Sequence, residues 1–371
     1  MLKQLNTYYY SFLGMLLYAS TAVIFVFYTI FLQNSGLSVP EIGIILGLSY
    51  IGVFLSPLLF LKLKFNIKNI QIAFILFGLI HFLMVYEVYN VYYMILILFL
   101  YGGIRNTIQT YIDSQTSKTF KEKYGIIRGM GSVGFLLTTF FVGLYYSNLL
   151  LEYFVYFITI SSIIIGLTMG MKYKNIEFKE EAFDFSIITD NKLYWTFILV
   201  YHISLGVLFS FLSIYLIDRS YEMSQLGNIW NISVLSEIIM LFTFVLIANK
   251  LSINNFIILA IIMTIIRFLL LYIYPENYVI ALGAQVLHLF TFPIFHINTM
   301  KTIERLFPNN MKMGLKSYFA IGYGLSLAIG SFLGSYIYGD NLFLYVTGIT
   351  LISLVLWFIF NKVQLKEEKI K

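Results

Sequence analysis

The sequence predicts an all-α integral membrane protein with twelve transmembrane helices in two six-helix halves. Three observations predict this fold class. Of the 371 residues, 60% are hydrophobic and only 11% are charged, which is more apolar surface than a water-soluble chain of this length can bury. The apolar residues form continuous runs of about 20 residues, long enough to span a bilayer as helices. The basic residues cluster in alternate turns between these runs.

The first half of the chain contains six apolar runs joined by short polar turns. The turns that we expect on the outer side carry acids, namely Glu41, Glu87 and Glu152. The first run is too long for a cleavable signal peptide and lacks a small-residue cleavage site, so it is expected to be the first helix. The predicted spans of this half are 8–32, 42–61, 70–86, 91–112, 129–147 and 153–171.

Residues 172–192 form the longest polar stretch and are predicted to be a cytoplasmic linker, because acids and lysines alternate there without an apolar period. The second half then repeats the alternation of runs and turns, with Glu276 and Asp340 in outer turns. The predicted domains are therefore residues 1–171, the linker, and residues 193–371. The predicted spans of the second half are 194–217, 226–248, 254–274, 278–300, 317–338 and 341–360.

The lysines and arginines predict the orientation. All but three of the 24 fall in turns or termini on one side, the exceptions being Arg219 in an outer turn and Arg105 and Arg267 inside apolar runs. By the positive-inside rule both termini are expected in the cytoplasm, with the chain in a bacterial cytoplasmic (inner) membrane. The net charge of +6 reflects this topology and does not indicate nucleic acid binding. Without cysteine there is no disulfide or thiol chemistry, and no cofactor or metal is predicted.

An internal repeat supports the division into halves. At an offset of 184 residues, Phe27–Leu32 aligns without gaps with Phe211–Leu216, and Gly43 aligns with Gly227. This offset is close to half the chain length, as a duplicated six-helix bundle predicts.

Glu237 is the only ionisable residue in the apolar run Leu226–Ala248 and lies at its centre. Such a carboxylate costs about 2.5–3.5 kcal/mol on insertion scales and normally marks a proton, ion or substrate pathway. Arg267, His288 and His296 lie in the next two runs. Desolvation favours the protonated form of a carboxyl group, whereas a nearby arginine favours the carboxylate. Water entry can therefore change which form of Glu237 predominates. These four residues are predicted to couple transport to protons. The alternative is a static Glu237–Arg267 ion pair.

The histidines of the apolar runs each have more than one possible role. His288 and His296 are eight residues apart, about 80° around a helix, so both can face one cavity. Histidine exchanges protons near neutral pH and could relay a proton or bind substrate, but near a helix end it can simply cap or snorkel. The same alternatives apply to His202 in the run 194–217. Trp230 lies seven residues before Glu237 on the same helix face and is predicted to line the cavity.

In the first half, Arg105 lies beside Gly102 and Gly103, two turns before Asp113. An arginine in this place could bind an anionic substrate through a bidentate contact, or it could pair with Asp113. Small-residue strips near 129–147 and 317–338 are predicted to allow close packing and sliding between the halves. The glycines of these strips are Gly125, Gly129, Gly131, Gly134, Gly322, Gly324, Gly330 and Gly334.

Two stretches resemble the major facilitator superfamily. Tyr124-Gly-Ile-Ile-Arg-Gly-Met-Gly-Ser-Val-Gly-Phe135 is similar to the family's Tyr-Gly-x-x-Arg-x-x-Gly-Ser-x-Gly motif, and Gln285–His296 is similar to its tenth-helix signature. Ser236, Glu237 and Arg267 stand at the matching spacing. More narrowly, the chain resembles the branch that holds the phenylpropionate permeases and the oligosaccharide–proton symporters such as lactose permease.

This resemblance implies a role for several residues. Asp113 and Arg128 occupy the positions of the acid–arginine pair that holds sugar hydroxyls in lactose permeases, although such a pair could equally brace the adjoining loop. Phe135 aligns with the tryptophan that stacks on sugar there. Thr291 replaces the second glutamate of the lactose permeases and Met240 replaces an asparagine, whereas Thr291, Phe292 and His296 fit the phenylpropionate pattern. The resemblance therefore implies that Thr291 contacts substrate.

The predicted function is import of a small organic solute, an aromatic acid or a saccharide-like molecule, by proton symport with alternating access. The expected partners are the solute, the proton and the lipid bilayer, and the chain is expected to be a monomer. One alternative is a proton-driven exporter of sugars or drugs. Another is a polytopic membrane transferase using His288 or His296 with Glu237, but its catalytic loop would not fit in the short turns, so no enzyme is predicted. The sequence also contains no nucleotide-binding P-loop.

Overall fold

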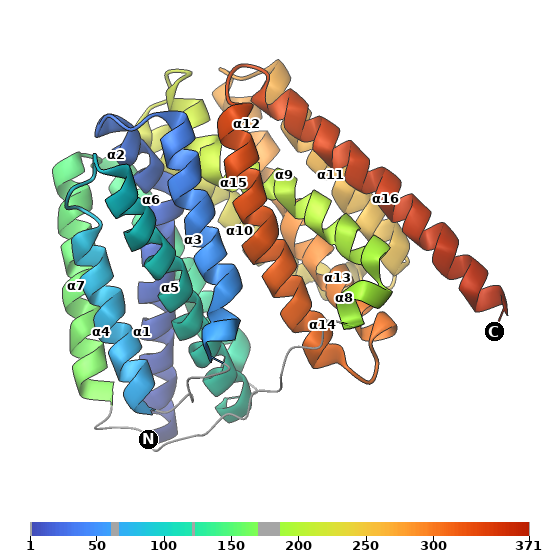
Figure 1. Cartoon of the computed structure of the whole chain (residues 1–371), viewed down its shortest axis with the longest axis horizontal. Coiled ribbons are helices and arrows are strands. Elements are labelled where there is room, and N and C mark those ends of the chain that lie inside the picture. The colour runs from blue at the N-terminus through green and yellow to red at the C-terminus, as the bar shows by residue number, and fades with distance from the viewer. Residues whose placement is uncertain (1, 61–66, 121–122, 170–185, 371) are drawn as a thin grey trace. The chain divides into compact units, whose positions relative to one another are not determined.

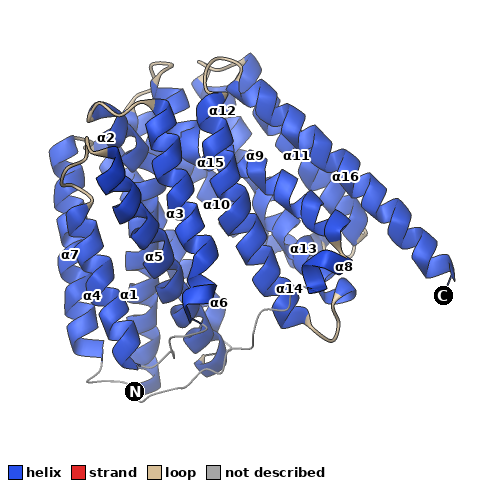
Figure 2. Cartoon of the chain, in the orientation of Figure 1, coloured by secondary structure: helices blue, strands red, loops and turns tan. Residues whose placement is uncertain are grey.

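The computed structural model describes residues 2–60, 67–120, 123–169 and 186–370, and every regular element in them is helical (Figure 2). In this part of the chain, eleven helical segments are long and apolar enough to cross a membrane, and Lys68–Leu83 is a shorter apolar helix. These segments follow the twelve predicted runs in order, so the predicted all-α membrane fold is confirmed.

The chain divides into two compact units, Met1–Ala182 and Phe183–Lys371. In the first unit, three elements follow one another as one long span: α1 (Leu2–Ala22), the π-helical turn η1 (Val23–Tyr28) and α2 (Thr29–Asn34). The remaining helices of this unit are α3 (Val39–Phe60), α4 (Ile67–Leu83), α5 (Val91–Thr119), α6 (Tyr124–Leu144) and α7 (Asn148–Met169).

In the second unit, two spans contain a π-helical turn at mid-length. The tenth span consists of α12 (Tyr278–Val286), η3 (Phe290–Ile294) and α13 (Phe295–Leu306). The eleventh consists of α14 (Met311–Tyr318), η4 (Phe319–Leu325) and α15 (Ser326–Tyr336). The other helices are α8 (Ser186–Asp190), α9 (Lys192–Ile217), α10 (Met223–Ile247), α11 (Ile253–Ile273) and α16 (Leu342–Ile370).

Most of the predicted linker, residues 172–185, lies outside the described residues. The last part of this predicted linker contains the short helix α8, which packs against the start of α9. The Trp195 indole donates a hydrogen bond to the Ile187 carbonyl at 2.9 Å, which holds α8 in place.

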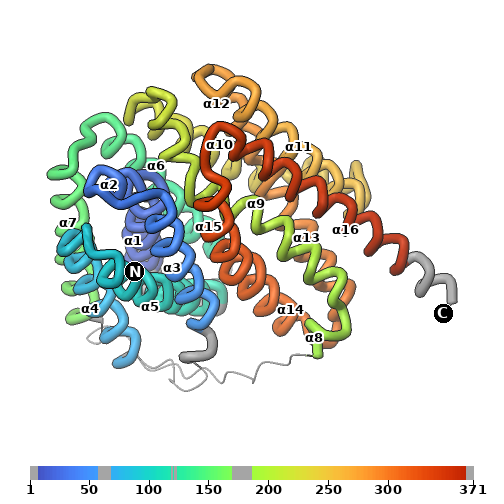
Figure 3. The backbone as a smooth tube through the Cα atoms, turned by 45° about the horizontal axis from the view of Figure 1, so that its top comes forward, coloured from blue at the N-terminus to red at the C-terminus, as the bar shows by residue number. Residues whose placement is uncertain are grey.

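The same helix pairs recur in both units. In the first unit α1 packs on α6, α3 on α5 and α4 on α7 (Figures 1 and 3). In the second unit α9 packs on α15, α10 on α12 and α11 on α16, which is the same order of spans. This recurrence supports the duplicated six-helix bundle inferred from the sequence offset.

Glycines allow the closest of these helix contacts. A Cβ atom at Gly134 of α6 would lie 2.4 Å from the Met15 carbonyl oxygen of α1, and a Cβ atom at Gly330 of α15 would lie 2.4 Å from the Ile203 carbonyl oxygen of α9. We expected these strips to act between the halves. Each of these two glycines makes its close approach to a helix of its own unit, and the two helix pairs are equivalent.

Replacing Gly102 by alanine should destabilise the first unit. The new Cβ atom would lie 2.0 Å from the Ser49 carbonyl oxygen, so α3 and α5 would have to separate. Overpacking of this kind costs about 1–3 kcal/mol, measurable as a lower midpoint of thermal unfolding in detergent. Gly125→Ala is the matched control, because a Cβ atom added there would have nothing within 4 Å. Equal midpoints for the two variants would contradict the prediction.

Candidate functional site

Three spans of the second unit bring Glu237, Arg267 and His288 together. Glu237 lies on α10, Arg267 on α11, and His288 between α12 and η3. The Glu237 Oε2 atom is 3.7 Å from His288 Nε2, and Arg267 Nη1 donates a hydrogen bond to His288 Nδ1 at 3.1 Å. The imidazole therefore links the acid to the arginine. A direct Glu237–Arg267 ion pair, our static alternative, is not among the ion pairs of the described residues.

These contacts assign the tautomer of His288. An arginine side chain has donors and no acceptor, so His288 Nδ1 accepts the bond from Arg267. A neutral imidazole then carries its proton on Nε2, the nitrogen that faces Glu237. Because the arginine occupies Nδ1, the carboxylate side is the one on which His288 can exchange a proton.

Arg267 is a buried cation surrounded by neutral acceptors. Its side chain is only 1% exposed, and it also donates to Thr291 Oγ1 at 3.0 Å and to Gln285 Oε1. Ser233 donates to the same Gln285 oxygen at 2.8 Å. Buried charges are normally paired with an opposite charge, so this uncompensated arrangement marks a candidate functional site.

Gln285 is a site residue that the sequence reasoning did not single out. The sequence did contain a signal for Gln285, because an amide side chain inside an apolar run needs a buried hydrogen-bond partner. Thr291, predicted to contact substrate, is fully buried here and is a hydrogen-bond partner of Arg267.

His296 lies apart from the other three predicted proton residues. The rings of His288 and Phe292 stack with centroids 5.7 Å apart, and those of Phe292 and His296 stack at 5.4 Å. Both histidines thus lie on one face, as predicted, but Phe292 separates them. His296 Nδ1 is instead 3.1 Å from the Tyr318 hydroxyl. Pro293, which lacks an N–H donor, lies inside η3 between the two histidines and accounts for the widened turn.

Two predicted cavity residues lie in packed interiors. Trp230 is buried, and its indole donates to Ser213 on α9 at 3.1 Å. Phe135, which aligns with the sugar-stacking tryptophan, is also buried on α6. In this structure both side chains contribute to helix packing.

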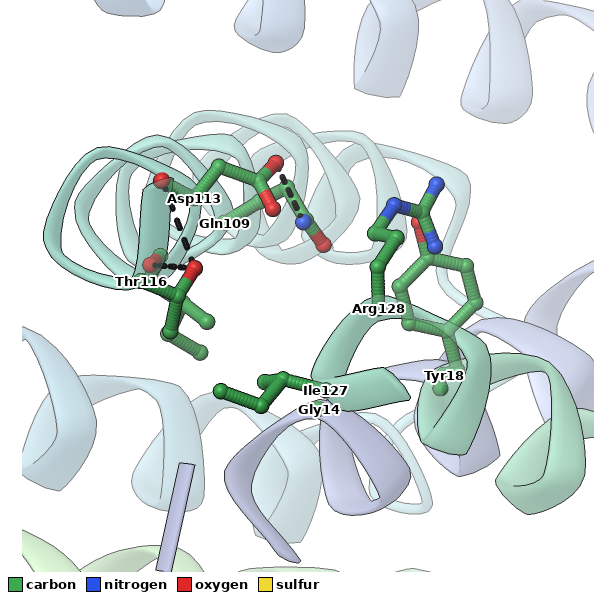
Figure 4. A pocket seen from close by; sticks show the side chains of 9 residues that line it. Gly14, Tyr18, Gln109, Asp113, Thr116, Ile127 and Arg128 are labelled. Atoms are coloured by element: carbon green, nitrogen blue, oxygen red, sulfur yellow. Dashed lines mark hydrogen bonds between the residues drawn. The ribbon is translucent and has the colours of Figure 1, made fainter. Parts of the chain in front are cut away.

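A pocket in the first unit brings Asp113 and Arg128 together (Figure 4). Asp113 accepts a hydrogen bond from Gln109 at 2.7 Å, and the Arg128 guanidinium lies 4.5 Å from the centre of the Tyr18 ring. The resemblance implied that this acid and this arginine share a site, and they line the same pocket. The lining residues come from α1, α5 and α6: Gly14, Tyr18, Gln109, Ile112, Asp113, Thr116, Ile127, Arg128 and Gly131.

Arg105 approaches the same tyrosine from deeper in the unit. Its guanidinium carbon is 5.7 Å from the centre of the Tyr18 ring, and Nη2 donates to Thr21 Oγ1 at 2.9 Å. Its Nε is buried without a partner among the described residues. The alternative ion pair between Arg105 and Asp113 is not among those of the described residues. Two cationic groups therefore flank Tyr18, while Asp113 is the acid of the pocket.

The first unit also contains a buried histidine network that the sequence reasoning missed. His81 on α4 is 1% exposed, and its Nε2 is 2.6 Å from the hydroxyl of Ser20 on α1. That hydroxyl is 3.1 Å from the hydroxyl of Tyr101 on α5. His81 Nδ1 lies 2.7 Å from the Phe77 carbonyl and so donates to it, which leaves Nε2 to accept from Ser20. The network ties three helices together.

Comparison with known proteins assigns the family. The model of the MFS_1 like family matches residues 7–361, nearly the whole chain. The chain belongs to this family. No curated protein matches the sequence significantly. Among solved structures, the nucleoside transporter NupG has a TM-score of 0.82 at 16% identity, covering 98% of this chain and 100% of its own.

Two further structures share the fold. Tetrameric PepTSo2 has a TM-score of 0.73 at 10% identity, with 100% of both chains covered. A bacterial homolog of the human lysosomal transporter Spinster, in an inward-facing and occupied conformation, has a TM-score of 0.65 at 12% identity, covering 98% of this chain and 97% of its own. At these identities the likeness shows the fold alone.

The chain is thus a multi-span membrane transporter of the major facilitator type, and the membrane-transferase alternative is set aside. The expected superfamily is confirmed, whereas the narrower branch remains a prediction.

Proposed function

We propose that this transporter imports a small organic solute together with a proton. The observation that carries the proposal is the linked set of Glu237, His288 and Arg267, in which a membrane-embedded carboxylate faces a histidine Nε2 at 3.7 Å. Intramembrane acids are costly and mark proton or substrate pathways. A group that exchanges a proton as water enters and leaves is what symport requires.

The physical cycle follows from the two states of the carboxyl group. When Glu237 is protonated, its neutral form suits a closed, dehydrated cavity. When water enters, the carboxylate and the His288 Nε2–H can form a charge-assisted hydrogen bond, and the proton is released. Arg267 fixes the imidazole through this cycle by holding Nδ1. In alternating access, this exchange occurs on one side of the membrane at a time.

The proposed substrate is an organic acid or a saccharide-like molecule held partly by the first unit. Arg105 and Arg128 flank Tyr18, and guanidinium groups bind carboxylates strongly. Thr291, Phe292 and His296 match the phenylpropionate-permease pattern, which favours an aromatic acid. Asp113 and Gln109, which lie side by side, can form hydrogen bonds with the hydroxyl groups of a sugar. Saccharides are therefore the second proposed class of substrate. The fold shared with a nucleoside transporter adds nucleosides to the compounds worth testing.

We also propose that the protein is a monomer in a bacterial cytoplasmic membrane, with both termini in the cytoplasm. Residues 172–192 would then be a cytoplasmic linker between the bundles 1–171 and 193–371.

A thermal-shift screen of purified protein against aromatic acids, oligosaccharides and nucleosides would identify the substrate class. Radiolabelled uptake into proteoliposomes with an imposed pH gradient then tests symport. Accumulation against the solute gradient when the outside is acidic supports the proposal, and uptake indifferent to the pH gradient contradicts it. Solute efflux driven by an inward proton gradient would make the protein an exporter.

Arg105→Gln should weaken binding of an acidic substrate by about tenfold or more, because a charge-assisted hydrogen bond contributes about 1.5–3 kcal/mol. Binding of a neutral analogue should change much less, and both are measured by the thermal shift. Arg305→Gln, at an exposed arginine in the last turn of α13, is the control for a general loss of positive charge. An equal loss of affinity for the acidic substrate and for its neutral analogue would show that Arg105 does not bind the acidic group.

A further inference from the structure

We propose that His202, with His296, Tyr318 and Tyr323, forms a second proton station in the second unit. The proposal rests on the proposed proton symport and deepens it, because it adds a place where the proton is held after it leaves Glu237 and His288. The four residues come from α9, α13, the end of α14 and η4.

His202 has an unused basic nitrogen. It is 1% exposed, and its Nδ1 lies 2.9 Å from the Ile198 carbonyl oxygen. A carbonyl only accepts, so Nδ1 carries the proton and Nε2 is a bare acceptor. Among the described residues Nε2 has no hydrogen-bond partner. A buried acceptor left unsatisfied is costly and calls for an explanation, and a proton bound in another state of the transport cycle supplies one.

Aromatic rings surround this histidine. The ring centres of Tyr201, Phe295, Tyr318 and Tyr323 lie 5.5, 5.6, 5.5 and 5.2 Å from that of His202, with steep interplanar angles. Aromatic faces attract cations when water is excluded. The surroundings can therefore hold an imidazolium although no carboxylate is paired with His202 in the described structure.

Tyrosine hydroxyls connect this environment to His296. Tyr318, fully buried, places its hydroxyl 3.1 Å from His296 Nδ1, and the Tyr323 hydroxyl is 3.4 Å from both the same nitrogen and the Tyr318 hydroxyl. A hydroxyl can accept one proton while donating another, so a proton can pass along these groups and leave each tyrosine unchanged. The last step to His202 Nε2 takes a hydroxyl rotation or a water molecule.

The titratable groups that face His202 are Tyr201 on its own helix and His296, Tyr318 and Tyr323 from the elements around it. Helices α8, α10, α15 and α16 also pack on α9 and add none to the contacts of His202 described here. Protonation of this site is therefore governed by the His296–tyrosine cluster.

The station lies further along the helix than the Glu237–His288 pair. His296 is eight residues beyond His288, about 12 Å along the helix axis, toward the end of α13 that carries Lys301 and Arg305. Those basic residues place this end on the expected cytoplasmic side. The π-helical turns η3 and η4 adjoin the station, and such turns are frequent at functional sites. The order of transfer is then Glu237 and His288 first, the station second, and the cytoplasm last.

The test uses the four histidines of the chain, His81, His202, His288 and His296, and needs no substrate. Protein labelled with ¹³C at histidine Cε1 is titrated in micelles, and single variants assign each resonance. We expect the His202 resonance to titrate reversibly. Its midpoint should move by about half a pH unit or more in Tyr318→Phe, which removes the hydroxyl link and keeps the ring.

Two matched pairs separate this role from simple packing. Tyr194→Phe removes a buried hydroxyl that has no partner among the described residues, so it should leave the His202 midpoint unchanged. Gly322→Ala would place a methyl group 3.2 Å from His202 Nε2 and should reduce His202 protonation, whereas Gly283→Ala, with nothing within 4 Å, should not. A His202 resonance that does not titrate, or responds equally to both tyrosine variants, would overturn the proposal.

The outcome is distinguishable from failure of the proposed function. If uptake by the parent protein ignores the pH gradient, proton symport is wrong whatever the resonances do. If uptake follows the gradient but His202 stays neutral, the symporter stands and the second station does not exist.

Discussion

Glu237→Gln should abolish accumulation driven by a pH gradient and leave exchange of labelled for unlabelled solute intact. Glutamine keeps the size and polarity of the side chain but cannot release a proton. With one proton per solute, a gradient of one pH unit can sustain about tenfold accumulation, because each tenfold ratio corresponds to about 1.4 kcal/mol. In the variant the solute should only equilibrate. Proteoliposome uptake measures accumulation, and counterflow measures exchange.

Glu276→Gln is the matched control, since this exposed glutamate lies in the turn between α11 and α12. It should accumulate solute like the parent protein. Persistent accumulation by the Glu237 variant at neutral pH would show that another group carries the proton. Loss of exchange as well as accumulation would move Glu237 from proton coupling to substrate binding or folding.

Arg267→Gln should reduce the initial rate of gradient-driven uptake by about tenfold or more with only a small change in the unfolding midpoint. Arg267→Gln removes the charge-assisted hydrogen bond that orients the His288 imidazole, which contributes about 1.5–3 kcal/mol. An increase of about 1.4 kcal/mol in the barrier to proton transfer already slows that step tenfold. Without the guanidinium, His288 Nδ1 can take a second ring proton, and a lasting carboxylate–imidazolium pair with Glu237 can trap this proton.

The small stability change follows from opposing terms. Removing the guanidinium recovers a desolvation cost of several kcal/mol, while its acceptors lose their bonds. Two of these acceptors retain another hydroxyl nearby: Ser233 donates to Gln285 at 2.8 Å, and the Thr291 hydroxyl is 3.2 Å from His288 Nδ1. A large fall in the unfolding midpoint with normal uptake by the folded fraction would instead make Arg267 a structural brace. Arg267→Lys completes the series, because one ammonium group keeps the charge without the planar fork.

Residues of the second-unit cluster could be found in the sequence because the bilayer makes them costly. Glu237, Arg267 and His288 each interrupt an apolar run, and ionisable residues inside a membrane span are rare and normally functional because they are costly. His81 escaped notice because its partners, Ser20 and Tyr101, are ordinary residues in apolar spans. Only the packing of α1, α4 and α5 shows that they complete a hydrogen-bonded network.

Periodicity specifies a helix face but not the neighbour that covers it. Trp230 shares a helix with Glu237, yet α9 covers its indole through Ser213. The spacing of His288 and His296 correctly places them on one face, but it does not reveal that Phe292 stacks between them or that Tyr318 binds the second. Gly134 and Gly330 pack within their units because the partner backbone happens to be α1 or α9.

The sequence by itself determined the membrane class, the order of the twelve spans and the list of polar groups within them. These features follow from the properties of the bilayer. Backbone polar groups there must be hydrogen-bonded within a helix, and a charged side chain is costly and normally marks a functional site. Only the tertiary structure decided which groups meet: His288 links Glu237 to Arg267, Gln285 joins them, and His202 keeps a nitrogen without a partner among the described residues. Contacts between distant spans depend on helix rotation and side-chain packing, which the hydrophobic pattern does not specify.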